Sequence, residues 1–532
     1  MTSMTSMTSM TDANGTAPLH KGAILTIVLV SYFMILLDNS VIFTALPSLQ
    51  ADLQLSGTEL AWVQNAYTLV FGGLLLLGAR AGDILGRKPV FIFGLIVFSV
   101  ASLLIALSPA GWWIIASRAL QGVGAAIVAP SALSLITVTF HGQERSRAVA
   151  WYSATAGIGA TLGLVVGGAM ASWFSWRAGF FINVPIGLAM LVLAPRFLPR
   201  TPPLPGRFDI IGALTSTVGV GSLVFATLNA ADNGWASPAT LVGFAVAAVV
   251  LTLFIVAEAR AVQPIMPLRL FASRLRTGAY LTRLLYLGAM IGFFFFTSQY
   301  LQEALGFTPL QAGLAFLPMT LVNFAVAVAI PRLTARFGNT LPLVVGIALT
   351  LAGMLWLSRI APDSSYLTAV ALPMLLIGAG QGLAFAPMTT FGISGATAAD
   401  AGAASGVVNT FHQVGSSLGL GILVAVAGAA AVGTDRGVAA AITVEATAAL
   451  TAGSVFLLAA LLIVLAVIVP ASAALHRRDA TSAADGDHAP TTLAAARPAW
   501  SRTTTKGTRD DRTHSRAARD RRFRPEARRA DR

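Results

Sequence analysis

Fourteen long apolar runs follow one another between Lys21 and Pro470. An α-helix needs about 20 apolar residues to cross about 30 Å of hydrocarbon, because it rises about 1.5 Å per residue. The runs are continuous, whereas the strands of a membrane β-barrel alternate over about ten residues. The sequence therefore predicts an all-α polytopic membrane protein with 14 transmembrane helices, at about residues 22–46, 60–79, 89–108, 112–137, 148–171, 179–198, 209–229, 239–258, 278–300, 310–330, 341–359, 366–391, 403–431 and 447–470.

The composition excludes several other classes of protein. Hydrophobic residues make up 56% of the chain and charged residues only 11%, whereas a soluble domain carries about 25% charged residues. This balance excludes a soluble enzyme, a disordered chain and a disulfide-rich scaffold. Because the sequence has no cysteine, it also excludes thiolate catalysis and cysteine-based metal sites.

Basic residues gather in the loops on one side of the predicted membrane. The net charge of +13 is typical of nucleic-acid binding, but 13 of the 35 Lys and Arg lie after Arg478 and most others lie in short loops. With a cytoplasmic N-terminus, the inner segments carry 17 cations and the outer segments carry three, Arg177, Arg359 and Arg436. Inner loops are enriched in Lys and Arg, so both termini are predicted to be cytoplasmic. No nucleic-acid partner is expected.

Polar tails flank the apolar region at residues 1–20 and 471–532. The second tail is rich in Arg, Ala, Thr and Asp, cannot bury a core and is predicted to be disordered. It is interpreted either as a solvated topology anchor or as a contact with anionic lipid through residues 516–532.

Away from the span ends, few ionisable side chains lie inside the predicted spans, among them Asp38, Arg118 and Arg283. Such residues are costly in lipid and mark functional candidates. Asp38 lies about 24 Å from the inner start of its span and Arg118 about 9 Å from the outer start of its own, by helical rise. Both are therefore expected in the outer half of the membrane, paired directly or through water. Asp38 is either a proton-coupling site that Arg118 tunes or half of a static ion pair, since an arginine stays protonated.

Arg283 and Glu258 lie near the inner ends of their spans. Arg283 is expected to extend to the membrane interface along its aliphatic stem. Glu258 is expected to be interfacial too.

Four polar residues are candidate substrate contacts, at Gln121, Gln299, Glu303 and His412. Glu303 is interpreted either as a contact for a cationic group or as an ordinary loop charge. His412 is interpreted either as a hydrogen-bonded structural residue or as a proton relay. The histidines are scattered, so no metal site is expected. No phosphate-binding loop occurs, and no cofactor is expected.

The loop between the second and third spans reads GARAGDILGRK, from Gly78 to Lys88. Its glycines allow a tight turn and close helix approach. The spacing G-x3-G-D-x2-G-R-K resembles the loop signature of the major facilitator superfamily, which lies at the same place. The resemblance implies a conformational latch made of Gly82, Asp83, Gly86, Arg87 and Lys88.

Other segments resemble the fourteen-span drug:proton antiporter branch of that superfamily. They cover most of residues 30–420, in the order LLDNSVIFTALP, SRALQGVGAA, GIGATLGLVVGG, WRAGFFINVPIG, ALGFTPLQAGLAFLP, GAGQGLAFAP and SGVVNTFHQVGSSLG. The third segment, GIGATLGLVVGG, resembles the fifth-helix antiporter motif. The family usually has a proline where this chain has Leu164, so a kink that depends on that proline is not expected here. The glycines of this segment form a stripe that allows close helix contact, at Gly159, Gly163, Gly167 and Gly168.

The resemblance implies two six-helix bundles with inverted repeats and alternating access. The expected boundaries are an N-terminal tail at 1–20, a first bundle at 21–200, two additional helices at 201–260, a second bundle at 261–470 and the C-terminal tail at 471–532.

The function implied is proton-coupled export of amphiphilic small molecules across the plasma membrane by a secondary active transporter, expected to be monomeric. Two alternatives are a dedicated exporter of one endogenous natural product and a symporter for uptake. A receptor or a polytopic enzyme would need a soluble domain or a catalytic cluster, and the sequence offers neither.

Overall fold

The computed structural model describes residues 20–203, 205–206, 208–397, 400–432 and 437–475, and describes residues 153 and 156 by their backbone alone. These ranges contain helices and no strand. Fourteen helices are long and apolar enough to cross a membrane, which confirms the predicted number of spans. The expected tails at 1–20 and 471–532 lie almost entirely outside the described residues, as do Arg207, Arg436, Arg477 and Arg478.

The first seven helices supply the first six spans, because α6 and α7 form one span. Their bounds are α1 (Lys21–Leu53), α2 (Gly57–Leu85), α3 (Arg87–Ala106), α4 (Gly111–Thr139), α5 (Gly142–Trp173), α6 (Trp176–Phe181) and α7 (Asn183–Phe197). Two more spans follow, α8 (Ile210–Asn233) and α9 (Pro238–Arg260).

The remaining helices supply the last six spans, several of which contain a π-helical turn or are divided in two. Their bounds are η1 (Leu268–Ala272), α10 (Arg274–Gln299), η2 (Tyr300–Ala304), α11 (Pro309–Ala315), α12 (Leu317–Phe337), α13 (Thr340–Leu357), η3 (Tyr366–Ala371), α14 (Leu372–Ile393), α15 (Ala401–Ala431), α16 (Val438–Ile463) and η4 (Val464–Ile468).

Some helices extend beyond the apolar runs that predicted them. The first was expected to end near residue 46, but α1 continues through Pro47 to Leu53. Its hydrogen-bonded ladder persists into polar sequence until Gln54, whose left-handed backbone ends the helix. The last span begins at Val438 and reaches Leu475, inside the range expected to be tail.

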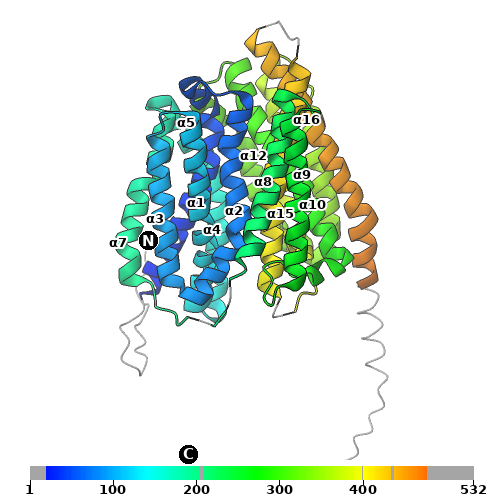
Figure 1. The fold of residues 1–532 in the computed structure, drawn as a ribbon. Helices are drawn as coiled ribbons and strands as arrows, with labels where there is room; N and C mark the ends of the chain where they lie inside the picture. Colours follow the sequence, from blue (N-terminus) through cyan, green and yellow to red (C-terminus); the bar gives the residue numbers. More distant parts are fainter. Residues whose placement is uncertain (1–19, 204, 207, 398–399, 433–436, 476–532) are drawn as a thin grey trace, which may run out of the picture. The chain divides into compact units, whose positions relative to one another are not determined.

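The helices run side by side in two groups (Figure 1). Helices α1 to α7 contact one another and form what we call the N-terminal half, whereas α10 to α16 form the C-terminal half. Helix α9 packs on α8, and α8 lies against both α2 and α15. Helix α8 thus covers the line along which α2 and α15 meet, which we call the α2–α15 seam.

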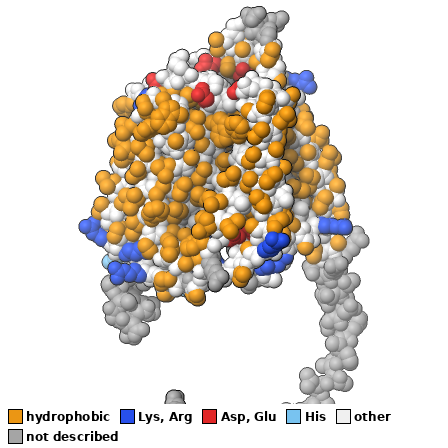
Figure 2. Space-filling view, in the orientation of Figure 1, with side chains coloured by type: hydrophobic (Ala, Val, Ile, Leu, Met, Phe, Trp, Pro, Cys, Tyr) orange, Lys and Arg blue, Asp and Glu red, His pale blue; other side chains and the backbone are white. Residues whose placement is uncertain are grey.

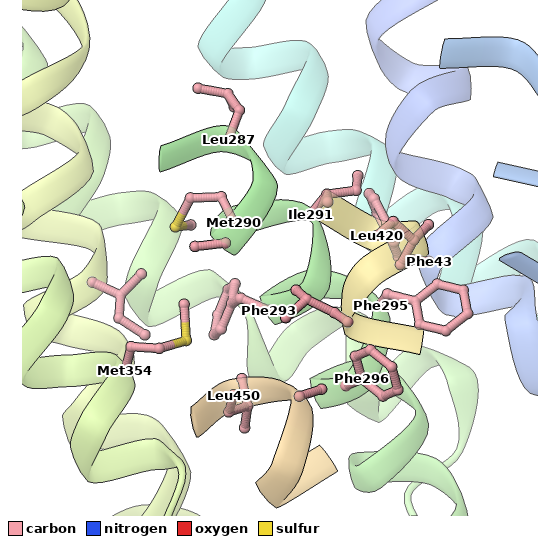
Figure 3. Packing of buried hydrophobic residues seen from close by; sticks show 14 of the residues in the cluster. Phe43, Leu287, Met290, Ile291, Phe293, Phe295, Phe296, Met354, Leu420 and Leu450 are labelled. Carbon is pink, nitrogen blue, oxygen red and sulfur yellow. The ribbon is translucent and has the colours of Figure 1, made fainter. Parts of the chain in front are cut away.

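A large apolar cluster fills the C-terminal half and continues into α1 to α6 and α8. Figure 3 shows Phe293, Met354 and Leu450 within it, and Phe43 of α1 beside Leu420. Phe43 also stacks on Phe294 with ring centroids 5.3 Å apart. The core of one half is therefore continuous with a helix of the other.

Most Lys and Arg of the described residues lie at the end of the helices where α1 begins, which we call the basic end. They are low in the view of Figure 2, and most Asp and Glu are high. The other end, where α1 ends, is called the far end. The described charged residues at this end include Asp52, Glu59, Arg177, Asp232, Glu303, Arg359 and Asp363.

The two halves are joined at the far end by hydrogen bonds. Ser298 of α10 donates through its hydroxyl to the carbonyl oxygen of Phe43 at 2.6 Å. The backbone N–H of Leu310 on α11 donates to the hydroxyl of Ser172 on α5 at 2.9 Å. Direct contacts of α1 with α10 and of α5 with α11 therefore close this end.

Candidate functional site

The carboxylate of Asp38 is enclosed in the N-terminal half, with no exposed surface on its side chain. Arg118 Nη1 donates to Oδ2 at 2.7 Å. Oδ1 accepts from Gln121 Nε2 and from Asn183 Nδ2, each at 2.8 Å. The structure therefore brings the two residues expected to pair into direct contact, without an intervening group.

Arg118 is the largest fully buried side chain of the described residues. Its Nε donates to the carbonyl oxygen of Val63 at 3.1 Å, and its guanidinium lies 4.3 Å from the centre of the Tyr67 ring. Nη2 has no acceptor among the described residues. Buried charges are stable when paired and hydrogen-bonded, and this pair is nearly but not completely satisfied.

Helical spacing explains how these groups meet. Gln121 lies one turn after Arg118 on α4, so both side chains point to the same face and form a 2.6 Å hydrogen bond. Gln121 also donates to the hydroxyl of Ser102 on α3 at 2.9 Å. Gln121, a candidate substrate contact, thus lies within hydrogen-bonding distance of Asp38 and has no exposed surface.

Asn183 is a member of this network that the sequence analysis did not select. It begins α7, directly after the short helix α6, and it is fully buried. Its amide oxygen has no partner among the described residues. The signal available was its place in the WRAGFFINVPIG segment, where a polar amide interrupts an apolar span.

The glycine stripe of α5 lies against α1 on both sides of Asp38. A β-carbon at Gly163 would lie 2.6 Å from Ser40 Cβ, and one at Gly167 would lie 2.7 Å from Val41 Cα. Real Cβ atoms do not approach this closely. The two helices therefore touch through their backbones next to the buried carboxylate.

Gly168 turns to the other half of the molecule. A β-carbon there would lie 2.4 Å from the carbonyl oxygen of Pro309 at the start of α11. In return, a β-carbon at Gly313 would lie 2.4 Å from the carbonyl oxygen of Leu164. Leu164, the residue at the family's proline position, thus lies where α5 meets α11 and is nearly fully buried.

The loop from Gly82 to Lys88 lies at the basic end. Arg87 donates to Asp83 at 3.2 Å and to the carbonyl oxygen of Ser134 on α4 at 3.3 Å. Lys88 donates to the carbonyl oxygen of Pro195 on α7 at 2.6 Å. The loop's charged side chains therefore connect α2 and α3 to α4 and α7.

Two glycines shape this loop. Gly86 has φ +92°, a conformation that side chains rarely adopt, and ends α2 before α3 begins. A β-carbon at Gly82 would meet Ser131 at an ordinary 3.5 Å. The turn thus depends on Gly86 for its backbone conformation.

The expectation that Arg283 extends to the membrane interface is wrong. Arg283 is only 4% exposed. Its Nη1 donates to the hydroxyl of Thr389 at 2.9 Å, and Nη2 lies 3.2 Å from Nδ1 of His412. Its position along α10 allowed an interfacial side chain, but the rotation of α10 turns it toward α14 and α15.

Glu258 lies two residues before the end of α9, at the end of its span as expected, but its side chain is covered by protein, with 3% of its surface exposed. One carboxylate oxygen accepts from the backbone N–H of Met266 at 3.0 Å. The connection after α9 folds back over this carboxylate. The periodicity of the sequence does not predict that contact.

Two other candidate substrate contacts lie at the far end. Gln299 is buried and donates to the carbonyl oxygen of Phe295 in its own helix at 3.1 Å. Glu303 is exposed on η2. Neither lies in the hydrogen-bonded network of Asp38, and His412 contacts Arg283 in the C-terminal half.

Several known proteins are similar to this chain in sequence. The chain is 38% identical over 418 residues to the cephamycin export protein CmcT of Amycolatopsis lactamdurans, covering 77% of this chain and 86% of that protein. It is 38% identical over 434 residues to the puromycin resistance protein pur8 of Streptomyces alboniger, covering 80% and 85%. It is 34% identical over 401 residues to the tetracenomycin C resistance and export protein of Streptomyces glaucescens, covering 75% and 74%.

Solved structures show the same fold. The human organic anion transporter MFSD10 (TETRAN) superposes with a TM-score of 0.56 at 17% identity, covering 84% of this chain and 99% of that one. A peptide transporter POT in complex with sulfate superposes with a TM-score of 0.60 at 13% identity, covering 83% and 94%. The family described as Major Facilitator Superfamily matches residues 28–420. The chain is a multi-pass membrane protein that belongs to the Major Facilitator Superfamily.

Proposed function

We propose that this protein is a proton-coupled antiporter that exports amphiphilic organic compounds across the plasma membrane by alternating access. The observation that carries the proposal is the Asp38 carboxylate, which is fully buried within a span and held by an arginine and two amides. An ionisable group in this position is a functional candidate because it is costly in lipid.

The relatives support outward transport of small organic molecules. Two of the three described above are named export proteins, and two are named resistance proteins. Export of an antibiotic accounts for both kinds of name. The names differ in the compound, so they support either one dedicated natural-product substrate or a broader set.

Asp38 is the group on which a proton can bind and leave. In the described conformation its charge is balanced by Arg118, which always carries its proton. Proton binding neutralises the carboxylate, removes its attraction for Arg118 and weakens the contact between α1 and α4. Proton loss restores the ion pair, so the protonation of Asp38 is coupled to helix position.

The contacts between the halves support a rocking motion. The far end is closed by the Ser298–Phe43 and Leu310–Ser172 hydrogen bonds. Opening it breaks few directional contacts, since the halves meet there mainly through glycine-lined surfaces and apolar side chains. The loop from Gly82 to Lys88 is proposed as the latch at the basic end.

The distribution of charge supports the orientation. The basic end carries most Lys and Arg of the described loops and is therefore proposed to face the cytoplasm, with both termini. The closed far end then faces outward, and Asp38 lies about 8 Å inside it, five residues before Phe43 by helical rise. We propose that one chain suffices for transport.

The test is proton release from inverted vesicles that hold an acidic interior, on addition of lipophilic cations and antibiotics one at a time. Wild type is compared with Asp38→Asn and with Asp363→Asn, whose carboxylate is exposed in a far-end loop. Wild type and Asp363→Asn should collapse the gradient with a substrate, and Asp38→Asn should not.

Other outcomes change the proposal in defined ways. An equal response of Asp38→Asn and wild type would make Asp38 structural. A response to one compound alone would identify a dedicated exporter, and a response to several would identify a multidrug exporter. No proton release with any compound that the vesicles accumulate would refute antiport.

A further inference from the structure

Arg283 is a second buried arginine in the membrane-spanning region, and the proton mechanism does not use it. It lies nine residues after the start of α10, about 14 Å along the helix and inside a membrane-spanning segment. Only 4% of its surface is exposed. A charge at this depth is retained when it has a partner or a ligand.

The immediate partners of Arg283 are neutral. Nη1 donates to the Thr389 hydroxyl at 2.9 Å, and Nη2 lies 3.2 Å from the ring of His412. The guanidinium lies 4.2 Å from the centre of the Phe385 ring. These groups orient the guanidinium, but none of them carries a negative charge that balances it.

Arg283 differs from Arg118 in lacking a carboxylate. Within the part of the chain that the structure describes, no Asp or Glu lies within ion-pairing distance of Arg283, whereas Arg118 pairs with Asp38 at 2.7 Å. The helices α10, α14 and α15, which surround it, contain no acidic residue. The negative charge that balances Arg283 must therefore come from elsewhere.

Hydrogen-bonding capacity remains on one edge of the guanidinium. The Nε–H has no acceptor among the described residues although it is buried. Nη2 carries two hydrogens, of which one serves His412. These two donors are the pair that binds a carboxylate through two parallel hydrogen bonds.

Polar residues follow one face of α15 as far as His412, the neighbour of this edge. Asn409 is exposed although it lies eight residues into the span, and Ser405 is exposed one turn before it. His412, one turn further, is partly exposed. Because exposed amides are costly in lipid, this stripe faces the interior of the transporter.

We propose that Arg283 binds a carboxylate group of the exported compound, with Thr389 and His412 orienting its guanidinium. This inference rests on the proposed export function and narrows its substrates to amphiphiles that carry a carboxylate. Under this proposal the proton site lies in the N-terminal half and the anion site lies in the C-terminal half.

The experiment measures equilibrium binding of two dyes to purified protein in detergent, without a proton gradient. The probes are 7-(diethylamino)coumarin-3-carboxylic acid and its 3-carboxamide, which share the apolar ring system and differ in charge. Wild type should bind the acid at least about tenfold more tightly than the amide, a difference of about 1.4 kcal/mol. Arg283→Gln should lose this preference and still bind the amide, which shows that the variant is folded.

The controls separate charge from general damage. Arg283→Lys keeps the charge and should retain part of the preference. Arg336→Gln removes an exposed arginine at the end of α12 and should retain all of it. Asp38→Asn should also retain it, so the anion site can stand even if the proton role of Asp38 fails.

Two results would overturn the proposal. One is an equal affinity of the wild-type protein for the acid and the amide. This result can be interpreted without any variant. The other is an unchanged acid preference in Arg283→Gln. If Arg283→Gln does not fold, the wild-type comparison and Arg283→Lys still decide the question.

Discussion

A methyl group added at Gly168 should push the two halves apart at the far end. The β-carbon of Gly168→Ala would lie 2.4 Å from the carbonyl oxygen of Pro309 and 3.0 Å from Leu310 Cα. Both obstacles are backbone atoms, so a side-chain rotation cannot relieve the contact. Helix α5 or α11 must move by about 1 Å to reach the 3.4–4 Å of an ordinary contact.

The size of the effect follows from this contact. Overpacking of this kind costs about 1–3 kcal/mol. Alanine also favours the helix over glycine by about 1 kcal/mol, but that gain is present in both conformations and cancels from their ratio. The open far end should therefore become about 5- to 150-fold more populated, which corresponds to 1–3 kcal/mol.

Cysteine labelling can measure this shift, because the chain has no cysteine of its own. Ser298→Cys places a thiol in the closed contact with α1, where the native side chain has no exposed surface. Labelling by a membrane-impermeant maleimide should be slow in the Ser298→Cys background and faster when Gly168→Ala is added.

Gly157→Ala is the matched control on the same helix. Its β-carbon would face the C-terminal half as well, but its nearest neighbour is a ring carbon of Phe324 at an ordinary 3.5 Å. Labelling with Gly157→Ala should match the background. Equal labelling rates for Gly168→Ala and the background would refute the reasoning, as would an equal acceleration by both alanines.

Three further changes have defined outcomes in thermal unfolding of the detergent-solubilised protein. Arg118→Gln should cost about 3–5 kcal/mol because it leaves the buried carboxylate of Asp38 uncompensated, and the double variant Asp38→Asn/Arg118→Gln should be more stable than the single one. Hydrogen bonds from Arg269 hold the pKa of Asp400 below its ordinary value. The stabilisation relative to Asp400→Asn should thus be full above about pH 4 and fade as pH falls further. Gly86→Ala should cost about 1–3 kcal/mol, because φ +92° with ψ 137° is a backbone conformation that residues with a β-carbon rarely adopt.

Each of these predictions has an outcome that contradicts it. A single variant Arg118→Gln as stable as the double variant would show that the carboxylate is not strained by the loss of its partner. A stability difference for Asp400→Asn that persists unchanged to pH 3 would exclude the ion pair as its source. Gly402→Ala is the control for Gly86→Ala, since it is helical with open space around it, and it should not destabilise the protein.

The sequence was sufficient for the number of membrane spans and for the similar depth of the two residues of the buried pair. Hydrophobic length counts spans reliably because the hydrocarbon thickness is fixed, and the rise per residue placed Asp38 and Arg118 at similar depth. The partners that complete the network, Asn183 and Val63, are side-chain and backbone groups on other helices. Their positions next to Arg118 and Asp38 depend on tertiary contacts between helices, which no local sequence pattern predicts.

The failure at Arg283 has a specific physical origin. Its distance from the helix end allowed the side chain to reach the interface, but the rotation of α10 about its axis turns it to Thr389 and His412. Rotation is set by contacts with neighbouring helices. In α10 the apolar residues cover most of the circumference, so the sequence gives little indication of which face is inside.

The position of α8 makes the two sides of the transporter unequal toward the lipid. Leu228 of α8 faces Gly421 of α15, and Thr217 faces Gly73 of α2, so α8 shields the α2–α15 seam along much of its length. On the other side, α5 meets α11 and α12, and no helix of the described residues lies over both in this way. The line where α2 and α15 meet is therefore covered on its outer side by α8, whereas the line where α5 meets α12 carries no such cover among the described helices, so the two lines of contact between the halves differ in what separates them from the surrounding lipid.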